Sequence, residues 1–172
     1  MLKFMRLAVL LSSVLALGAQ AETEWVGKPF PNYDVKNQNG DVITNEKYKD
    51  KWVAYYFYPK DNTPGCSIEA ENFAKNQEKL EEVGLEVVGI SLDDVESHAE
   101  FAKDFNLKFD LLADTEKELS EKLDMVNILP WPHTRRETFI VNGEGVIVKH
   151  YAQVNPRKHV SEIIEDMKVL AK

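Results

Sequence analysis

Apolar positions along the chain follow two periodicities. Residues 52–58 (WVAYYFY) and 85–91 (LEVVGIS) are continuous apolar or aromatic runs, which predicts two strands covered on both faces. Residues 94–105 carry apolar side chains at Val95, Ala99 and Ala102, a spacing that predicts a helix. The other expected elements are a hairpin at 33–44, a helix at 64–82, a strand at 109–112, a short helix at 115–123, a hairpin at 137–151 and a helix at 156–170.

The order of these elements indicates the fold class. Strands that alternate with helices pair in parallel, and the hairpin near the end adds antiparallel strands. We therefore expect an α/β fold, with a mixed central β-sheet flanked by helices and a β-hairpin on its N-terminal side. Residues 22–172 contain no repeat, low-complexity segment or linker, and we expect them to form one domain.

The first 21 residues have the layout of a secretory signal peptide. Lys3 and Arg6 precede an apolar run at 7–17, and A-Q-A at 19–21 forms a cleavage pattern of small residues. The apolar run is short for a bilayer span, which favours cleavage over a permanent anchor. We expect a periplasmic protein, exported through a cleavable signal, with no stable membrane association afterwards.

Charge narrows the range of partners. The chain has 21 basic and 29 acidic residues, a formal net charge of −8. Removing residues 1–21 takes away Lys3 and Arg6 and no acid, which leaves 19 basic and 29 acidic residues and a net charge of −10. An acidic protein of this kind is not expected to bind nucleic acid or an anionic membrane surface.

The chain has one cysteine, Cys66. A single cysteine excludes an internal disulfide, a two-cysteine metal site and a C-x-x-C redox pair within one chain. Thr63 suits a helix N-cap and Pro64 the first helical position, so Cys66 falls in the first turn. Unpaired N–H groups and the helix dipole favour a thiolate there, and the Thr63 hydroxyl lies one turn before the sulfur.

A structural role for the thiol is equally compatible with the helix pattern. Cys66 lies on a largely apolar stripe, and free cysteine is among the residue types most often buried. The stripe comprises Cys66, Ala70, Phe73, Gln77 and Leu80.

Three blocks of sequence resemble one family. Pro59-x-x-x-Thr63-x-x-Cys66 resembles the signature of the peroxiredoxins, and the surrounding YFYPKDNTPGCSIEAE is similar to their bacterioferritin comigratory protein/Q-type branch (AhpC/TSA-like). Residues 87–114 are similar to the strand-helix-strand segment that follows the peroxidatic helix. Residues 136–140 (RETFI) resemble the R-x-[ST]-F strand of the family, and the blocks occur in the family order over nearly the whole chain after residue 21.

The resemblance implies a thioredoxin-like fold and the thiol-dependent reduction of hydrogen peroxide and organic hydroperoxides. Cys66 would be the peroxidatic cysteine, which attacks the terminal peroxide oxygen and becomes a sulfenic acid. Arg136 would stabilise its thiolate, Thr63 would hydrogen-bond the sulfur and the peroxide, and Pro59 would shield the sulfur from water. Neighbouring side chains of a strand point to opposite faces, so Arg135 is expected to be a solvated surface charge.

The sequence departs from many members of that branch at Glu71, where they carry a resolving cysteine. A sulfenic acid on Cys66 would then be reduced by an external thiol, in a one-Cys mechanism. A thioredoxin-like protein, glutathione or another small thiol would each serve, and a monomer or weak dimer is expected. Glu71 belongs to an acidic run that is interpreted as a solvated helix face: Glu69, Glu71, Glu78, Glu81 and Glu82.

An alternative hypothesis is a non-catalytic exported protein of thioredoxin fold that binds a partner or a metal through its single thiol. Copper carriers of related fold use C-x-x-x-C with a distant histidine, and Ala70 at the second position disfavours copper. The four histidines show no metal-ligand spacing, so no metal or cofactor is expected. His133, close to Arg136 in sequence, either lines the mouth of the pocket or, more simply, is a solvated loop histidine. Trp131 is either a packing residue or part of a peroxide-access surface.

Overall fold

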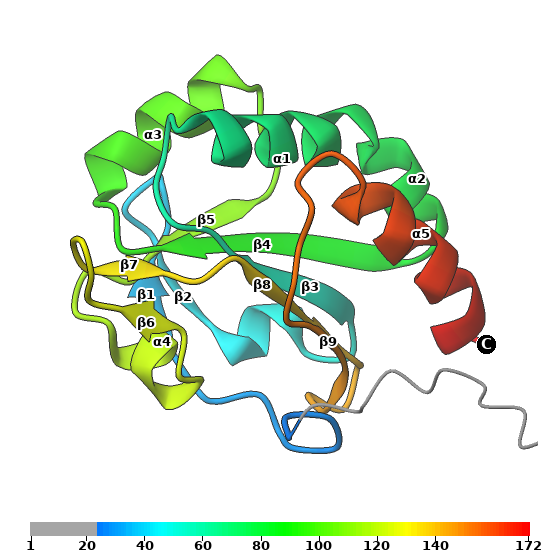
Figure 1. Ribbon diagram of the computed structural model, residues 1–172. Helices are drawn as coiled ribbons and strands as arrows, with labels where there is room; N and C mark the ends of the chain where they lie inside the picture. Colours follow the sequence, from blue (N-terminus) through cyan, green and yellow to red (C-terminus); the bar gives the residue numbers. More distant parts are fainter. Residues whose placement is uncertain (1–23) are drawn as a thin grey trace, which may run out of the picture.

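A five-stranded mixed sheet in the order β5-β4-β3-β8-β9 forms the centre of the computed structural model, which describes residues 24–172 (Figure 1). The strands β3, β4 and β5 run parallel, while β8 pairs antiparallel with β3 and β9 antiparallel with β8. This confirms the expected mixed sheet, and the predicted signal peptide at 1–21 lies outside the described residues. The strands are β3 Trp52–Phe57, β4 Leu85–Ser91, β5 Asp110–Ala113, β8 Glu137–Val141 and β9 Ile147–Tyr151.

Four helices cover one face of the sheet (Figure 1). Alternate residues of β3, Ala54 and Tyr56, point into this core together with Tyr58, which follows the strand. A Cβ on Gly89 of β4 would lie 2.8 Å from the Tyr56 ring and 2.6 Å from Leu111, so a glycine there leaves space for the tyrosine. The helices are α1 Pro64–Lys75, α2 Gln77–Glu82, α3 Val95–Asp104 and α5 His159–Leu170.

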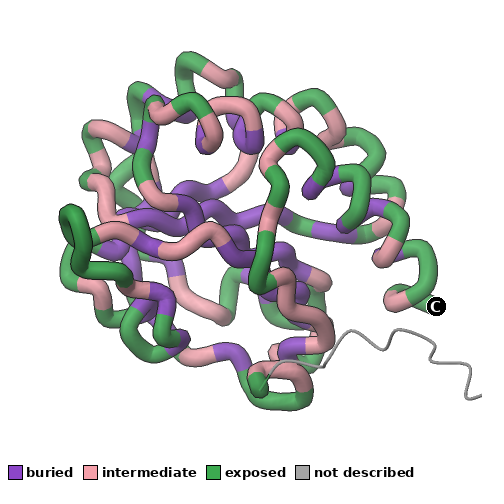
Figure 2. The backbone as a smooth tube through the Cα atoms, viewed as in Figure 1, coloured by how far each residue is buried: buried purple, intermediate pink, exposed green. Residues whose placement is uncertain are grey.

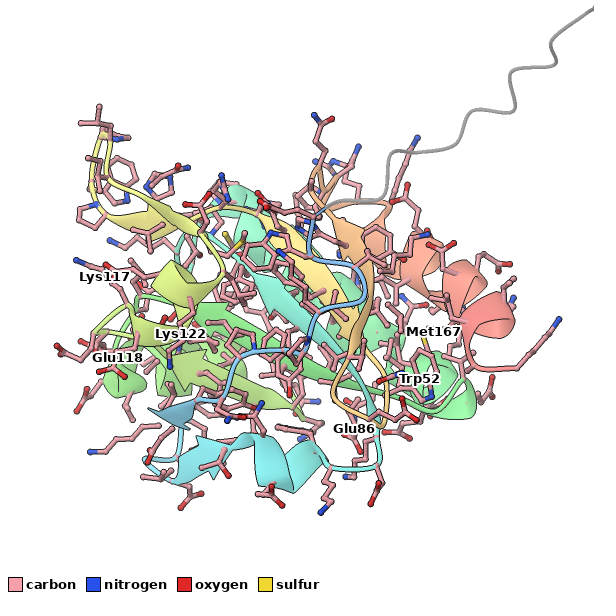
Figure 3. The ribbon with its side chains drawn as sticks, turned by 90° about the horizontal axis from the view of Figure 1, so that it is seen from below. Trp52, Glu86, Lys117, Glu118, Lys122 and Met167 are labelled. Carbon is pink, nitrogen blue, oxygen red and sulfur yellow. The ribbon has the colours of Figure 1, made fainter. Side chains whose placement is uncertain are left out.

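The opposite face is covered by the N-terminal segment, the predicted hairpin and α4 (Glu118–Lys122). The hairpin pairs β1 (Asp34–Lys36) with β2 (Val42–Thr44) and leads into a 3₁₀ helix, η1 (Asn45–Tyr48). Figure 2 shows the buried residues concentrated along the central strands, between these two layers. Seen from below, Lys117, Glu118 and Lys122 lie at one end of the molecule and Trp52 and Met167 at the other (Figure 3).

A two-stranded ribbon was not expected from the sequence. It pairs β6 (Val126–Asn127) with β7 (His133–Thr134) and ends in an exposed loop that contains Ile128, Leu129 and Trp131. Two-residue strands around a proline-rich loop give no periodic signal, which is why the pattern of apolar residues missed them.

Two predicted helix boundaries are wrong. The single helix expected at 64–82 is two helices that meet at Asn76, whose side chain donates back to the Asn72 carbonyl at 2.9 Å. The last helix begins at His159 and not at Pro156, because residues 156–158 form a turn. Asn155 does cap that turn, since its side chain accepts from the Arg157 N–H at 3.0 Å.

The buried face of α3 also differs from the prediction. His98 and Phe101 are buried with Ala102, whereas Ala99 is exposed and Val95 half-buried. The alanine methyl has little area to bury, so the Phe101 ring and the His98 hydrogen bonds decide which face turns inward.

Candidate active site

The only cysteine lies in the first turn of α1, directly above the end of β3. Thr63 occupies the N-cap position in extended conformation, Pro64 begins the helix, and the Ser67 N–H donates to the Thr63 carbonyl at 2.9 Å. Cys66 is the third residue of the helix, where backbone N–H groups have no partner within the helix. Its side chain is buried, with 1% of the residue exposed.

Arg136 meets the sulfur from the neighbouring strand. Because β8 pairs with β3 and places Glu137 opposite Phe57, the residue before β8 lies at the end of β3 where α1 begins. Nη2 of Arg136 donates to Sγ of Cys66 at 3.0 Å. A Cβ on Gly65 would lie 3.2 Å from that Nη2, so the glycine before the cysteine permits the approach of the guanidinium.

Glu69 is a site residue that the sequence analysis missed, and its assignment to a solvated acidic face is wrong. The side chain is fully buried, and Arg136 donates from Nη1 to Glu69 Oε2. Glu69 is three residues from Cys66 and four from Phe73, so helical spacing places it on the buried stripe. That spacing was the signal that could have found it.

Electrostatics couple Glu69 to Arg136. Burial raises the pKa of Glu69 from 4.5 to about 7, against the opposing effect of the Arg136 charge. The pKa of Arg136 is raised, because the nearby Glu69 and Cys66 outweigh the effect of its own burial. The guanidinium is therefore a permanent cation between the sulfur and a buried carboxyl group that titrates near neutral pH.

The other two predicted site residues lie in the loop that leads to α1, without a hydrogen bond to Cys66. The Thr63 hydroxyl is half-buried and donates to the Lys60 carbonyl at 3.0 Å, so it does not cap the helix through its side chain. Its oxygen still has lone pairs that can accept from a bound molecule. Pro59 is half-buried and follows Tyr58 at the end of the buried strand segment.

Arg135 points away from the thiol, as neighbouring residues of an extended segment do. Its Nε lies 2.9 Å from Glu137 Oε1 and its Nη2 lies 3.4 Å from Asp124 Oδ2, and the side chain is 37% exposed. The expectation of a freely solvated charge is therefore wrong in one respect, because Arg135 is held by two acids.

A buried network fixes the loop between β3 and α1. Asp61 accepts hydrogen bonds from Tyr58 Oη at 2.8 Å and from Ser97 Oγ at 2.7 Å. The His98 ring lies between two acceptors, with Nδ1 2.8 Å from Asp61 Oδ2 and Nε2 3.2 Å from the Leu112 carbonyl. These contacts tie residues 59–63 to α3 and β5 and so hold the start of α1 in place.

A second buried histidine lies behind Arg136. Nε2 of His159, the first residue of α5, lies 2.8 Å from Thr138 Oγ1. Burial, together with the charge of Arg136, lowers the pKa of His159 to about 4. The ring is therefore neutral at physiological pH, and Arg136 is the cation at the sulfur.

His133 and Trp131 lie on the β6–β7 ribbon. His133 is half-buried, with Nδ1 2.7 Å from the Trp131 carbonyl, and the Trp131 side chain is exposed. Within residues 24–172, no three His, Cys, Asp or Glu side chains gather as a metal site. The same residues contain no helix that is long and apolar enough to cross a membrane.

The geometry defines a class of protein. A thiol at a helix N-terminus, in contact with a fixed arginine, is arranged to attack an electrophilic atom and to stabilise the negative charge that moves onto the leaving group. A thioredoxin-like sheet and helices carry this pair.

Comparison with known proteins agrees with this class. Residues 26–150 match the AhpC/TSA family. The chain is 33% identical to peroxiredoxin Bcp of Bacillus subtilis over 148 residues, which cover 83% of this chain and 94% of that protein. It is 39% identical to the chloroplastic peroxiredoxin Q of Triticum aestivum over 144 residues, 81% of this chain and 64% of that one. A crystal structure of a serine-for-cysteine mutant of PrxQ from Xylella fastidiosa matches with a TM-score of 0.80 and 28% identity, covering 86% of this chain and 97% of that one.

The chain therefore belongs to the AhpC/TSA family of peroxiredoxins, with Bcp and peroxiredoxin Q proteins among its relatives. The family and the thioredoxin-like fold that the sequence resemblance implied are confirmed. The protein is a thiol-dependent peroxidase by family, and its single cysteine fits a one-Cys type.

Proposed function

We propose that this peroxidase reduces hydrogen peroxide and organic hydroperoxides through a sulfenic acid on Cys66, which an external thiol then reduces. One observation carries the proposal: Arg136 Nη2 lies 3.0 Å from the sulfur of a buried cysteine in the first turn of α1. Within this chain there is no second cysteine to form a disulfide.

The oxidation step balances as a displacement at oxygen. The Cys66 thiolate attacks the terminal oxygen of ROOH, the S–O bond forms, and the O–O bond breaks. The leaving alkoxide or hydroxide takes up a proton and departs as ROH or water, so that sulfur is oxidised by two electrons to sulfenic acid. Arg136 stabilises both the thiolate and the negative charge that moves to the leaving oxygen.

The remaining residues of the site support this step. The free lone pairs of the Thr63 hydroxyl accept from the peroxide O–H, and Pro59 limits the access of water. Glu69 holds the other end of the Arg136 guanidinium, which fixes the orientation of Nη2 toward sulfur. Glu69 is thus a positioning residue, since it contacts Arg136 and not the reacting atoms.

The proposal is tested by the stoichiometry of peroxide consumption. Reduced protein is mixed with excess hydrogen peroxide or tert-butyl hydroperoxide, first alone and then with a thiol such as glutathione. We expect rapid consumption of one equivalent without thiol and continuous turnover with it. Arg136→Ala should slow the first equivalent, while the neighbouring Arg135→Ala, matched in charge, should not. Turnover by Cys66→Ser at the rate of the native protein would refute the proposal.

We also propose that residues 1–21 direct export to the periplasm and are removed, leaving a monomer or weak dimer. The charge pattern and small residues of that segment support the export step. Fractionation of the producing cells and N-terminal sequencing of the native protein test it. A mature protein that begins at Glu22 in the periplasm is expected, and an intact N-terminus in the cytosol would refute it.

A further inference from the structure

The loops next to the thiol carry exposed basic residues, although the chain has a formal net charge of −8. Three segments that reach the site contain no acidic residue, although the chain has 29 of them: 62–68, 125–136 and 145–161. The first contains Cys66, the second ends at Arg136, and the third contains the loop that enters α5. The two acids that flank the first segment, Asp61 and Glu69, are buried, so neither presents its side chain on the surface beside the thiol.

The loop before α5 lies against the start of α1. A Cβ on Gly65 would lie 3.8 Å from Pro156 Cγ, and Asn72 donates to the Pro156 carbonyl at 3.0 Å. Figure 1 shows this loop beside α1. Arg157 and Lys158 follow Pro156 directly, so two cationic residues border the helix end that carries the thiol.

Lys60 supplies a third basic side chain near the thiol. It lies in the loop between β3 and α1, and its carbonyl accepts from the Thr63 hydroxyl. Lys60, Arg157 and Lys158 are exposed, and within residues 24–172 none of them forms an ion pair. We call these three residues the basic rim. A peroxide is neutral and gains little from such charges, whereas an anionic reductant is attracted by them.

We propose that the basic rim recruits a small anionic thiol as the reductant of Cys66, a carboxylate-bearing compound of the glutathione type. This inference rests on the proposed one-Cys function and extends it to the second half of the cycle. The burial of Cys66, a residue that is 1% exposed, supports the same choice, because a small thiol reaches a recessed sulfur more easily than a thiol on a protein surface does.

Reduction of the Cys66 sulfenic acid uses two molecules of the small thiol. The first thiolate attacks the sulfenic sulfur, an S–S bond forms, and hydroxide leaves as water after taking up a proton. A second thiolate attacks the sulfur of the small thiol in that mixed disulfide and releases the Cys66 thiolate. Two thiols are oxidised to one disulfide, and the sulfenic oxygen departs as water.

The test measures the reduction step alone. Cys66 sulfenic acid is formed with one equivalent of hydrogen peroxide and checked by mass, then mixed with glutathione or with its monoethyl ester. Glutathione carries two carboxylates and one ammonium group, and the ester carries one of each with the same thiol. We expect glutathione to react about 3- to 10-fold faster at low ionic strength, and the ratio to approach one at about 1 M salt, where screening acts within about 3 Å.

Charge-reversal variants test whether the preference for glutathione comes from the basic rim or from charges elsewhere on the surface. Arg157→Glu/Lys158→Glu should remove the preference for glutathione over the ester, and Arg157→Lys/Lys158→Arg should retain it. The matched control is Lys103→Glu/Lys108→Glu, which reverses two exposed charges on and after α3 and should keep the native ratio. Thermal denaturation of each variant shows whether the fold is intact.

The outcomes are distinguishable. Equal rate constants for glutathione and its ester, or a preference that survives the Arg157→Glu/Lys158→Glu change in a folded protein, would overturn the basic rim proposal and leave the peroxidase intact. Reduction by a thioredoxin-like protein but by neither small thiol would overturn it as well. If no sulfenic acid forms, the proposed function fails first and this inference with it.

Discussion

Replacement of Glu69 by glutamine should change the pH dependence of stability. Glu69 is fully buried, and its pKa is about 7 in the folded protein against an ordinary value of 4.5. A folded-state pKa above the unfolded one means that the folded protein holds this proton more tightly. The stabilisation is fully present below about pH 4.5 and is lost as the pH rises through about 7.

The size of this change in stability follows from the difference between the folded and unfolded pKa values of Glu69. The rise of the Glu69 pKa from 4.5 to about 7 corresponds to about 3 kcal/mol in total, most of which falls between pH 5 and pH 8. Glutamine has nearly the same shape, does not titrate, and keeps an oxygen that can accept from Arg136. The stability of Glu69→Gln relative to the native protein should therefore rise by about 2 to 3 kcal/mol over that range.

Urea denaturation at fixed ionic strength, repeated at several pH values from 5 to 8, measures this difference. Glu71→Gln is the matched control: it lies two residues further along α1, is exposed, and pairs with Lys75 at 2.7 Å. Its difference from the native protein should stay flat. A flat curve for Glu69→Gln, within about 0.5 kcal/mol, would refute the assignment of a proton to the buried Glu69 carboxyl group.

Substitutions at three positions probe the site and the loop that leads to it. Arg136→Lys should slow oxidation of Cys66 by peroxide about 10-fold, because a point charge replaces the directed donor. Arg136→Ala leaves no donor at all and should slow this oxidation about 100- to 1,000-fold. Stopped-flow oxidation measures both rates, and equal rates for the two variants would contradict this reasoning. His98→Asn should cost about 1 to 3 kcal/mol, because it removes the contacts of the buried ring with Asp61 and with the Leu112 carbonyl, and an unchanged urea midpoint would count against the loop anchor. Thr63→Val should change stability by less than about 1 kcal/mol, since its hydroxyl makes one bond to a loop carbonyl, yet slow oxidation; a rate equal to the native one would remove Thr63 from the site.

The fold could be predicted from sequence where burial alone decides the pattern. The runs at 52–58 and 85–91 became central strands because both faces of β3 and β4 are covered, which leaves no polar face to confuse the pattern. The β6–β7 ribbon and the break at Asn76 depend on single hydrogen bonds and short segments, which have no periodic signature.

Only those residues of the candidate site whose types and spacing form a recognisable motif could be predicted from the sequence. Cys66 and Arg136 belong to family-like motifs, and the structure brings them into contact. Glu69 and His98 were missed because their residue types usually face solvent. Their partners, Arg136 for Glu69 and Asp61 for His98, lie far from them in the sequence. The helical spacing of Glu69 is that of the buried stripe, whereas its residue type and the acidic run around it are typical of an exposed helix face.

The most direct test of the account is mass spectrometry of the reduced protein after one equivalent of hydrogen peroxide, with dimedone present to trap sulfenic acid. We predict a single adduct on the peptide that contains Cys66, formed within seconds, absent from Cys66→Ser and slower to form in Arg136→Ala. A folded protein whose Cys66 stays reduced for minutes under peroxide would contradict the central claim that this arginine-bound thiol is the reacting group.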